Sequence, residues 1–210
     1  PEAVRGPERR GEGDERVEIR DLTLACTDIT NRDGGDQHHL IDVECITAHG
    51  TSKIRRNVVV QNVHLGACIG SGFRTVGEPS IGNYVEGYVL FNVTADGSGI
   101  SPGSRSCYEV QRGSRLGAYV NVSGEGAKNS VFDSEITSGG PASNLVFVNC
   151  FFDGSKAAAS SNTFSIGGSS APGQYRSIDW TLCNVRVKGG YTGMYYGQRI
   201  RLYDCLFEYT

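Results

Sequence analysis

The strongest constraint on the fold is an eight-residue pattern that returns along the chain. In its clearest copies apolar residues hold the first, third, sixth and eighth positions, and Asn or Asp stands at the fifth. These copies read VEIRDLTL (residues 17–24), VVVQNVHL (58–65), LVFVNCFF (145–152) and IRLYDCLF (200–207). Weaker copies are IDVECITA (41–48), YVLFNVTA (88–95) and WTLCNVRV (180–187). Alternation with a period of two is typical of strands with one buried face, so each copy predicts two short strands that meet at the fifth position.

A repeat this short predicts a solenoid, because one copy cannot bury its apolar face alone. The interruption at the fifth position lets residues on both sides of it point inward. An Asn at the same corner of every coil would stack on its counterpart in the next coil. Its amide can donate and accept hydrogen bonds, and so can serve backbone groups that the bend leaves unpaired. We therefore expect an all-β, single-stranded parallel β-helix of about 9–11 coils, with one rung every ~4.8 Å. The predicted corner residues are Asp21, Cys45, Asn62, Asn92, Asp133, Asn149, Asn184 and Asp204.

The chain divides into two parts. Residues 1–16 are rich in Arg and acidic residues and almost free of apolar ones, which predicts a solvated arm or linker. Residues 17–210 form the predicted β-helix domain. Because the chain begins without Met and stops just after a complete copy of the repeat, we interpret it as a fragment or processed piece, with coils missing at its ends. No apolar run reaches the ~18 residues of a membrane-spanning helix, so no membrane partner is expected.

Composition argues against several partners. The formal net charge is −3 with both signs mixed, and no basic stripe alternates with aromatic residues, so nucleic acid is not an expected partner. The seven Cys include no Cys-x-x-Cys pair, which argues against a structural zinc site, and no cofactor is expected. Cys150 and Cys205 hold the inward sixth position of the repeat, where a small thiol packs well. Reduced, structural cysteines are therefore favoured over disulfides.

The outward positions of the middle copies are unusually apolar. They carry Val89, Phe91, Phe132, Val146 and Val148. An apolar stripe of this size on the outside of a solenoid is too large to leave in water. Either a loop or another copy of the chain covers it, and three β-helices side by side would bury one stripe per chain. We therefore predict a homo-oligomer, with the trimer as the favoured form.

Polar outward residues of the first copies provide the candidate site. Asp42 and Glu44 point outward on one strand, about 7 Å apart by strand rise, and His64 points outward on the next coil. Acid–base chemistry on a glycosidic bond uses such groups, so Asp42, Glu44 and His64 are candidates for acid, base and orienting group. Arg20, expected one rung below Glu44, could hold the carboxylate of an acidic sugar.

His39 and Gln61 complete the predicted substrate-binding set. His39 ends the segment DGGDQHH (33–39), and Gln61 is an outward residue of the second copy. A metal site from Asp36, His38 and His39 is a weaker alternative, because adjacent side chains on a strand diverge. The simplest alternative is that alternation exposes the polar residues of any strand, and that Arg20 and Glu44 merely pair with each other.

The register, the Asn/Asp corners and the Gly-rich loops of residues 17–210 resemble the right-handed parallel β-helices of the pectate-lyase-like superfamily. That group includes polysaccharide lyases, glycoside hydrolases, C5-epimerases and trimeric bacteriophage tailspikes, so the resemblance implies a fold more than a function. Its catalytic signatures are not matched. An Arg-x-Pro-x-x-Arg segment occurs at residues 5–10, but inside the charged arm, and the Asp-Pro-His-Glu of alginate epimerases is absent.

Two functions follow as expectations. The first is a segment of a tailspike or adhesin, on a virion or secreted, that binds a surface polysaccharide and can also cleave it. The alternative is a monomeric polysaccharide lyase or glycoside hydrolase with its site near Glu44. The apolar outer stripe favours the first, whereas the acidic and His residues are compatible with both.

Overall fold

The computed structural model describes residues 16–26, 38–97, 106–135, 140–155, 162–167, 177–195 and 197–209. The predicted arm, residues 1–16, lies outside these ranges except for Arg16. Over the described residues the protein is all-β, apart from two short 3₁₀ turns, η1 (Thr47–His49) and η2 (Pro79–Ile81). No helix in this part of the chain has the length and apolar character needed to cross a membrane.

Three parallel sheets make up the fold. Sheet A contains β1 (Val17–Leu24), β4 (Val58–Leu65), β7 (Val89–Asp96), β10 (Ala118–Val120), β11 (Ser123–Glu125), β13 (Val146–Val148), β14 (Phe151–Asp153), β16 (Thr181–Cys183), β17 (Arg186–Lys188), β19 (Arg201–Tyr203) and β20 (Leu206–Glu208). Sheet B contains β2 (Ile41–Cys45), β5 (Ser71–Gly77), β8 (Ser106–Gln111), β12 (Ser130–Glu135), β15 (Asn162–Ile166) and β18 (Tyr191–Met194). Sheet C contains β3 (Ile54–Arg56), β6 (Tyr84–Glu86) and β9 (Ser114–Arg115).

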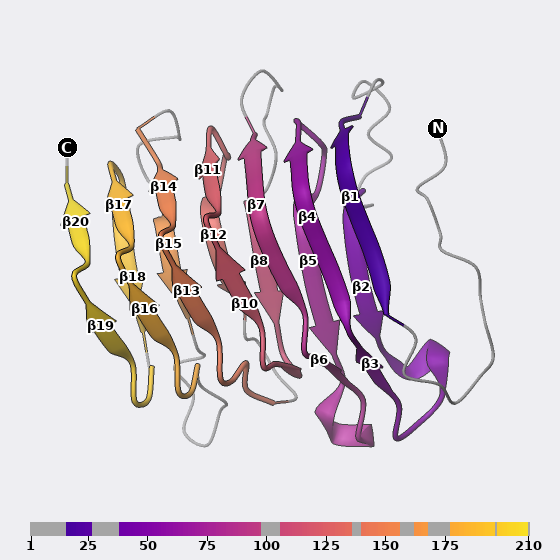
Figure 1. The fold of residues 1–210 in the computed structure, drawn as a ribbon. Coiled ribbons are helices and arrows are strands. Elements are labelled where there is room, and N and C mark those ends of the chain that lie inside the picture. The colour runs from indigo at the N-terminus through magenta and orange to yellow at the C-terminus, as the bar shows by residue number, and fades with distance from the viewer. Residues whose placement is uncertain are drawn as a thin grey trace.

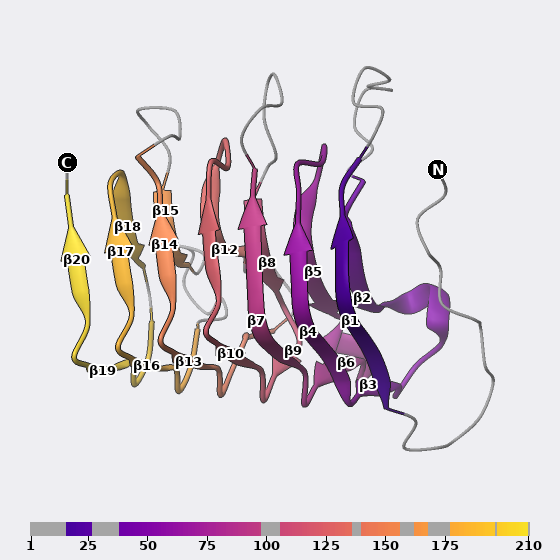
Figure 2. The same cartoon turned by 45° about the horizontal axis from the view of Figure 1, so that its top comes forward.

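The chain visits the three sheets in turn, and each visit adds a strand parallel to the one before (Figure 1). For example, β4, β5 and β6 pair with β7, β8 and β9 one turn later. Isolated parallel bridges through Ser143, Ile178 and Gln198 continue sheet C beyond β9. Figure 2 shows the strands following one another in a single row from β1 to β20. This curled, solenoid-like winding is compatible with the predicted β-helix.

Sheet A has fewer levels than the repeat predicted. We call each turn of the chain through sheet A a level. Eight of the eleven strands form four pairs whose members meet at a corner and make one level together, and the other three strands make one level each. The described residues therefore build seven levels, whereas about 9–11 coils were expected. Successive corners lie between 20 residues (Asn184 to Asp204) and 41 residues (Asp21 to Asn62) apart. Where the structure describes these longer intervals, they hold strands of sheets B and C and their connections.

The apolar positions of the repeat face the interior, as predicted. In the copies at 58–65 and 145–152, the first, third, sixth and eighth residues are at most 6 % exposed. Between the sheets, Phe147 stacks on Tyr119 with ring centroids 4.7 Å apart and lies 5.0 Å from Phe132 of sheet B. Each such buried ring contributes about 1.5–3 kcal/mol, which makes this interior the main source of stability.

All seven Cys are free, in agreement with the prediction. Cys150 is buried at the inward sixth position, and burial raises the pKa of its thiol to about 11. A thiol in this environment stays protonated and packs as a small apolar group.

The fifth position of the repeat forms a ladder of corner residues along sheet A. Each corner residue has φ between +50° and +55°, in the left-handed region that Asn and Asp adopt more readily than most residues. Asn62 donates from Nδ2 to Oδ1 of Asp21 at 2.8 Å. Bonds of the same direction, 2.8–3.3 Å long, follow from Asn92, Asn121, Asn149 and Asn184. The corner residues therefore stack across levels, as predicted, and their amides bind one another rather than the backbone groups that the sequence interpretation assigned to them.

A second corner, which the sequence pattern did not indicate, precedes the first by five residues. Its members also have positive φ, between +55° and +66°, and are Asn57, Gly87, Leu116, Asn144, Asp179 and Arg199. Four of the six are Asn, Asp or Gly, which adopt positive φ readily, whereas Leu116 and Arg199 are residue types that rarely do so. Each of these levels therefore has two bends with positive φ. A short straight strand lies between the two bends, and a second strand follows the bend at the fifth position.

Two predicted corners are wrong. Cys45 is fully buried at the end of β2, Asp133 lies inside β12, and neither has positive φ. The corner that the pattern missed is Asn121, whose copy of the repeat has Gly117 and Gly124 at its first and eighth positions. The ring of Tyr88 fills the space at Gly117, where a Cβ would lie only 2.2 Å from it.

Phe132, predicted on the outer stripe, instead lies in the core. It is 0 % exposed, and its ring stacks on Phe164 with centroids 4.9 Å apart. The prediction failed because it placed a corner at Asp133. β12 is one continuous strand whose residue Phe132 pairs with Phe164, so no bend turns Phe132 outward.

Replacing Asn149 tests the ladder. Asn149→Ala removes two exposed side-chain hydrogen bonds and leaves a less tolerant residue at positive φ, so we expect the free energy of unfolding to fall by about 1–3 kcal/mol. Asn149→Gly loses the same bonds but accepts the bend, and should cost less. Denaturant unfolding measures both, with the outward-facing Thr181→Ala as control. Losses no larger than that of the control would show that the ladder contributes nothing.

Candidate functional site

The structure separates the predicted site residues onto two sheets. β2 of sheet B carries two of them, β1 and β4 of sheet A carry three, and one lies just before β2. In full, Asp42, Glu44 and His39 belong to the sheet B group, and Arg20, Gln61 and His64 to the sheet A group.

The sheet A group forms no compact site. Arg20 lies beside Gln61 in the strand register and pairs with Glu18 at 3.5 Å. His64 shares a 2.8 Å hydrogen bond with Thr94, its register neighbour. Arg20 is therefore not in the column of Glu44, because β1 and β2 belong to different sheets.

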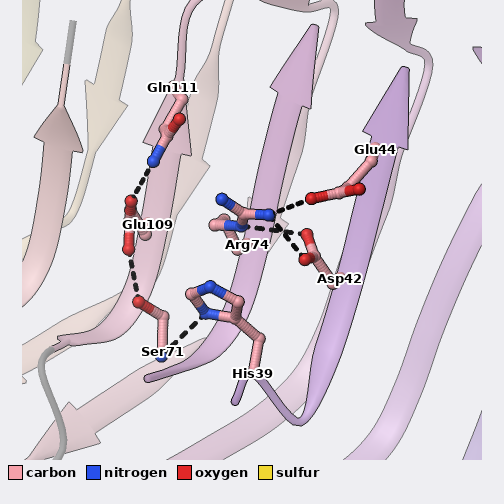
Figure 3. Close-up of polar contacts among 7 residues, drawn as sticks. All are labelled: His39, Asp42, Glu44, Ser71, Arg74, Glu109 and Gln111. Atoms are coloured by element: carbon pink, nitrogen blue, oxygen red, sulfur yellow. Dashed lines mark hydrogen bonds and ion pairs between the residues drawn. The ribbon is translucent and has the colours of Figure 1, made fainter. Parts of the chain in front are cut away.

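The sheet B group belongs to a larger set of polar side chains that three successive strands, and the residues just before β2, bring together (Figure 3). We call this set the sheet-B cluster; its members are His39, Asp42, Glu44, Ser71, Arg74, Glu109 and Gln111. Alternation on β2 turns Ile41 and Cys45 inward and leaves the two carboxylates outward. The parallel register then places Asp42 beside Arg74 of β5, and Arg74 beside Glu109 of β8.

Arg74 stands at the centre of the cluster and binds both predicted carboxylates. Its Nε and Nη2 donate to the two carboxylate oxygens of Asp42 at 3.0 and 2.6 Å, and Nη2 also donates to Glu44. The three side chains are half-buried: 15 % of Arg74, 28 % of Asp42 and 31 % of Glu44 remain exposed. One guanidinium thus fixes two carboxylates that a ligand can still reach.

Glu109 is the most deeply placed charge of the cluster. It is 0 % exposed, and it accepts hydrogen bonds from the Ser71 hydroxyl and from the Gln111 amide. His39 joins the group from the far side of Ser71, since its Nδ1 accepts the Ser71 backbone N–H at 2.9 Å. A chain of hydrogen bonds therefore runs from His39 through Ser71 and Glu109 to Gln111.

The two partners in the ion pair respond to burial and charge in different ways. Burial raises the pKa of Glu44, and the adjacent Asp42 carboxylate raises it further, against the opposing charge of Arg74. Burial alone would lower the pKa of Arg74, but the hydrogen bond and charge of Asp42 outweigh it and raise that pKa above its ordinary value. Glu44 thus takes up a proton more readily than an ordinary glutamate, beside a firmly charged guanidinium.

Sequence reasoning found Asp42, Glu44 and His39 but missed the rest of the cluster. Arg74 lies 32 residues after Asp42, and Glu109 lies 38 residues after Ser71. One signal was present: Glu109 and Gln111 are two residues apart in SCYEVQ, as Asp42 and Glu44 are in IDVEC. The equal spacing predicts that the two pairs of side chains lie on the same face of the sheet. It does so only once β2, β5 and β8 are known to be successive strands of that sheet.

The cluster combines groups that can donate and accept several hydrogen bonds with a carboxyl of raised pKa.

In the part of the chain that the structure describes, no group of three or more His, Cys, Asp or Glu side chains could hold a metal ion. The weaker metal hypothesis included Asp36, which lies outside the described residues. Neither a protein-family model nor a curated protein sequence matches this chain.

Glu44→Gln tests the raised pKa. A raised folded pKa means that the native state holds its proton more tightly than the unfolded chain, so stability falls as pH rises from about 4.5 through the folded pKa. The neutral variant escapes that loss. Thermal unfolding should find it at least as stable as the wild-type protein at pH 7, with no advantage below pH 4.

Glu86→Gln is the matched contrast. Burial alone would raise the pKa of Glu86, but hydrogen bonds from Arg56 and Arg115 outweigh it and lower that pKa. The stability from this ionised carboxylate is present above its unfolded pKa and is lost as pH falls through the folded one. Glu86→Gln should therefore destabilise the protein at pH 7 by about 1–3 kcal/mol, and less in acid. Equal effects of the two variants at pH 7 would contradict the assignment for Glu44.

Proposed function

We propose that this chain is a carbohydrate-engaging, right-handed parallel β-helix similar to those of the pectate-lyase-like superfamily, and that its sheet-B cluster contacts a polysaccharide. The three-sheet parallel winding supports the fold part of the proposal. Right-handedness follows the strong preference of parallel crossover connections. The natural setting of such a protein is a virion or the extracellular space, as part of a tailspike or adhesin.

The observation that carries the proposal is the fixed geometry around Arg74. Two partly exposed carboxylates are oriented by one guanidinium, on neighbouring strands of a parallel sheet. Sugars present neighbouring hydroxyl groups, which are both donors and acceptors. Charged groups held in fixed orientation bind such hydroxyls with less loss of side-chain entropy than mobile ones. Successive strands, about 4.8 Å apart, would let one extended glycan cross several levels.

Cleavage of the bound glycan is the second candidate function, and the raised pKa of Glu44 favours it. A carboxyl whose pKa is raised can act as general acid, while the adjacent Asp42 carboxyl can act as base or nucleophile. His64 shares a hydrogen bond with Thr94 on sheet A, so we assign the orienting role to Arg74 instead. The active species would be a monomeric lyase or hydrolase, or a cleaving tailspike.

A panel of capsular and acidic plant polysaccharides tests both functions. Calorimetry would report binding, and reducing ends or the absorbance of unsaturated products would report cleavage. Glu44→Gln should abolish turnover while leaving the melting temperature within a few degrees. Glu18→Gln, an equally exposed carboxylate on sheet A, is the control and should have no effect. Turnover that survives Glu44→Gln would place the site elsewhere, and a panel without any ligand would defeat the binding proposal.

We also propose that the outer face of sheet A is an interface in a homo-oligomer, with a trimer favoured. Val89 and Val146 flank Ala118 in one column, and Phe91 and Val148 flank Val120 in the next. These columns form an apolar strip without Phe132, and Val146 at one end of its column is 39 % exposed. Burying such a strip on each chain would stabilise an assembly by about 1.5–3 kcal/mol per large side chain.

Light scattering tests the interface. We expect a mass above that of one chain for the wild-type protein, and a monomer for Phe91→Glu combined with Val148→Glu. Thr94→Glu, on the neighbouring column beyond the corner, is the control and should leave the assembly intact. A monomeric wild-type protein would overturn the interface and favour the monomeric enzyme.

A further inference from the structure

Sheet C carries a second group of charged side chains, in one column across its three strands. Arg56 ends β3, Glu86 ends β6 and Arg115 ends β9, and the parallel register places the three side by side. Each is followed directly by a residue of the second corner, with positive φ. The repeated bend therefore brings a guanidinium, a carboxylate and another guanidinium to the same position on three successive strands.

The carboxylate of Glu86 holds both guanidiniums, through one nitrogen of each. Nε of Arg56 donates to Oε1, and Nε of Arg115 donates to Oε2 at 2.6 Å. The Glu86 side chain is only 10 % exposed, whereas that of Arg56 is 49 % and that of Arg115 is 34 % exposed. Within the described ranges these two bonds are the only hydrogen bonds of the two guanidiniums, so their Nη groups can still donate to a ligand.

The orientation of Arg115 is fixed from a second side. Its guanidinium carbon lies 3.8 Å from the centroid of the Tyr84 ring, which belongs to the neighbouring strand β6. Arginine stacks on an aromatic face through its planar guanidinium, which the compact ammonium of lysine cannot do. A side chain that is already held by a ring and a carboxylate loses less entropy when it binds a ligand.

The column is unbalanced in charge. Burial would raise the pKa of Glu86, but the hydrogen bonds and charges of Arg56 and Arg115 outweigh it and lower that pKa, so the carboxylate stays ionised. Two guanidiniums thus face one carboxylate. One arginine would neutralise Glu86, and the second leaves a positive charge that attracts an anion from outside.

We propose that Arg56 and Arg115 together bind a tetrahedral oxyanion, the phosphate or sulfate ester group of a ligand, through their Nη groups. Guanidiniums bind such groups by charge-assisted hydrogen bonds, often in pairs. The two arginines come from strands on either side of β6, and three terminal oxygens that point in different directions can accept from both. A carboxylate has two oxygens in one plane and matches a single guanidinium. The inference does not depend on the sheet-B cluster, which lies on another sheet.

Calorimetric titration of the whole chain tests the proposal. The probes are glucose 6-phosphate, glucose 6-sulfate and glucuronate at constant ionic strength, with glucose as the blank for contacts of the sugar alone. At least one ester should bind, and glucuronate should bind more weakly than that ester. Comparison of the two esters distinguishes phosphate from sulfate.

Conservative variants locate the site. Arg115→Lys keeps the positive charge beside Glu86 but loses the Nη pair, so it should weaken binding of the better ester about tenfold, and Arg56→Lys should do the same. Arg186→Lys is the matched control and should leave binding unchanged. Arg186 also pairs with a glutamate, Glu208, and lies 5.9 Å from an aromatic ring. Thermal unfolding without ligand shows that each variant is folded.

Four outcomes would overturn the proposal. Neither ester binds; glucuronate binds as tightly as the better ester; both lysine variants of the column are folded and bind like the wild-type protein; or Arg186→Lys weakens binding as much as Arg115→Lys does. If the column had a structural role alone, the lysine variants would change the melting temperature and there would be no ester binding to lose.

Discussion

The architecture depends on backbone bends with positive φ that recur at every level of sheet A. Along most of the sheet they come in pairs five residues apart, as at Asn57 and Asn62. A bend at the fifth position allows Val60 and Val63 both to point inward although they are three residues apart. Without it, strict alternation would turn the sixth and eighth positions to solvent. The buried columns, the parallel register and the amide ladder all require that bend, and the apolar interior holds it in place.

Because the inner positions are committed to packing, the outer positions are free to differ between sheets. On sheet A the middle levels expose aliphatic and aromatic columns. On sheet B the corresponding face carries the sheet-B cluster around Arg74. The same fold thus carries an apolar strip on one sheet and a charged, hydrogen-bonded cluster on another. Placing charged residues on this sheet costs desolvation energy. Glu109 is a fully buried carboxylate, and such a group is tolerated only with hydrogen-bond donors, here Ser71 and Gln111.

The sequence predicts part of this arrangement, for physical reasons. Period-two alternation and Asn at the corner are local signals, so parallel strands and inward residues such as Phe147 and Phe152 could be predicted. The level at 117–124 could not, because Gly117 and Gly124 contribute no apolar side chain to the pattern. The bends at Leu116 and Arg199 could not be predicted either, because Leu and Arg do not favour positive φ. Asp42 and Glu44 are a local pair, but their contact with Arg74 depends on how many residues lie between levels, which alternation does not encode.

The fit between Tyr88 and Gly117 bears on how such a protein can change. The tyrosine ring extends beyond its own level and occupies the volume that the next level leaves empty. These two levels therefore complement each other in volume and are not interchangeable. Duplication, deletion or recombination of a single level would separate the large residue from its small counterpart and create either a void or a collision. A viable rearrangement of this interior should therefore keep the levels of Tyr88 and Gly117 together. At this place the segment that must be inherited as a whole is two levels long, whereas the structural repeat is one level long.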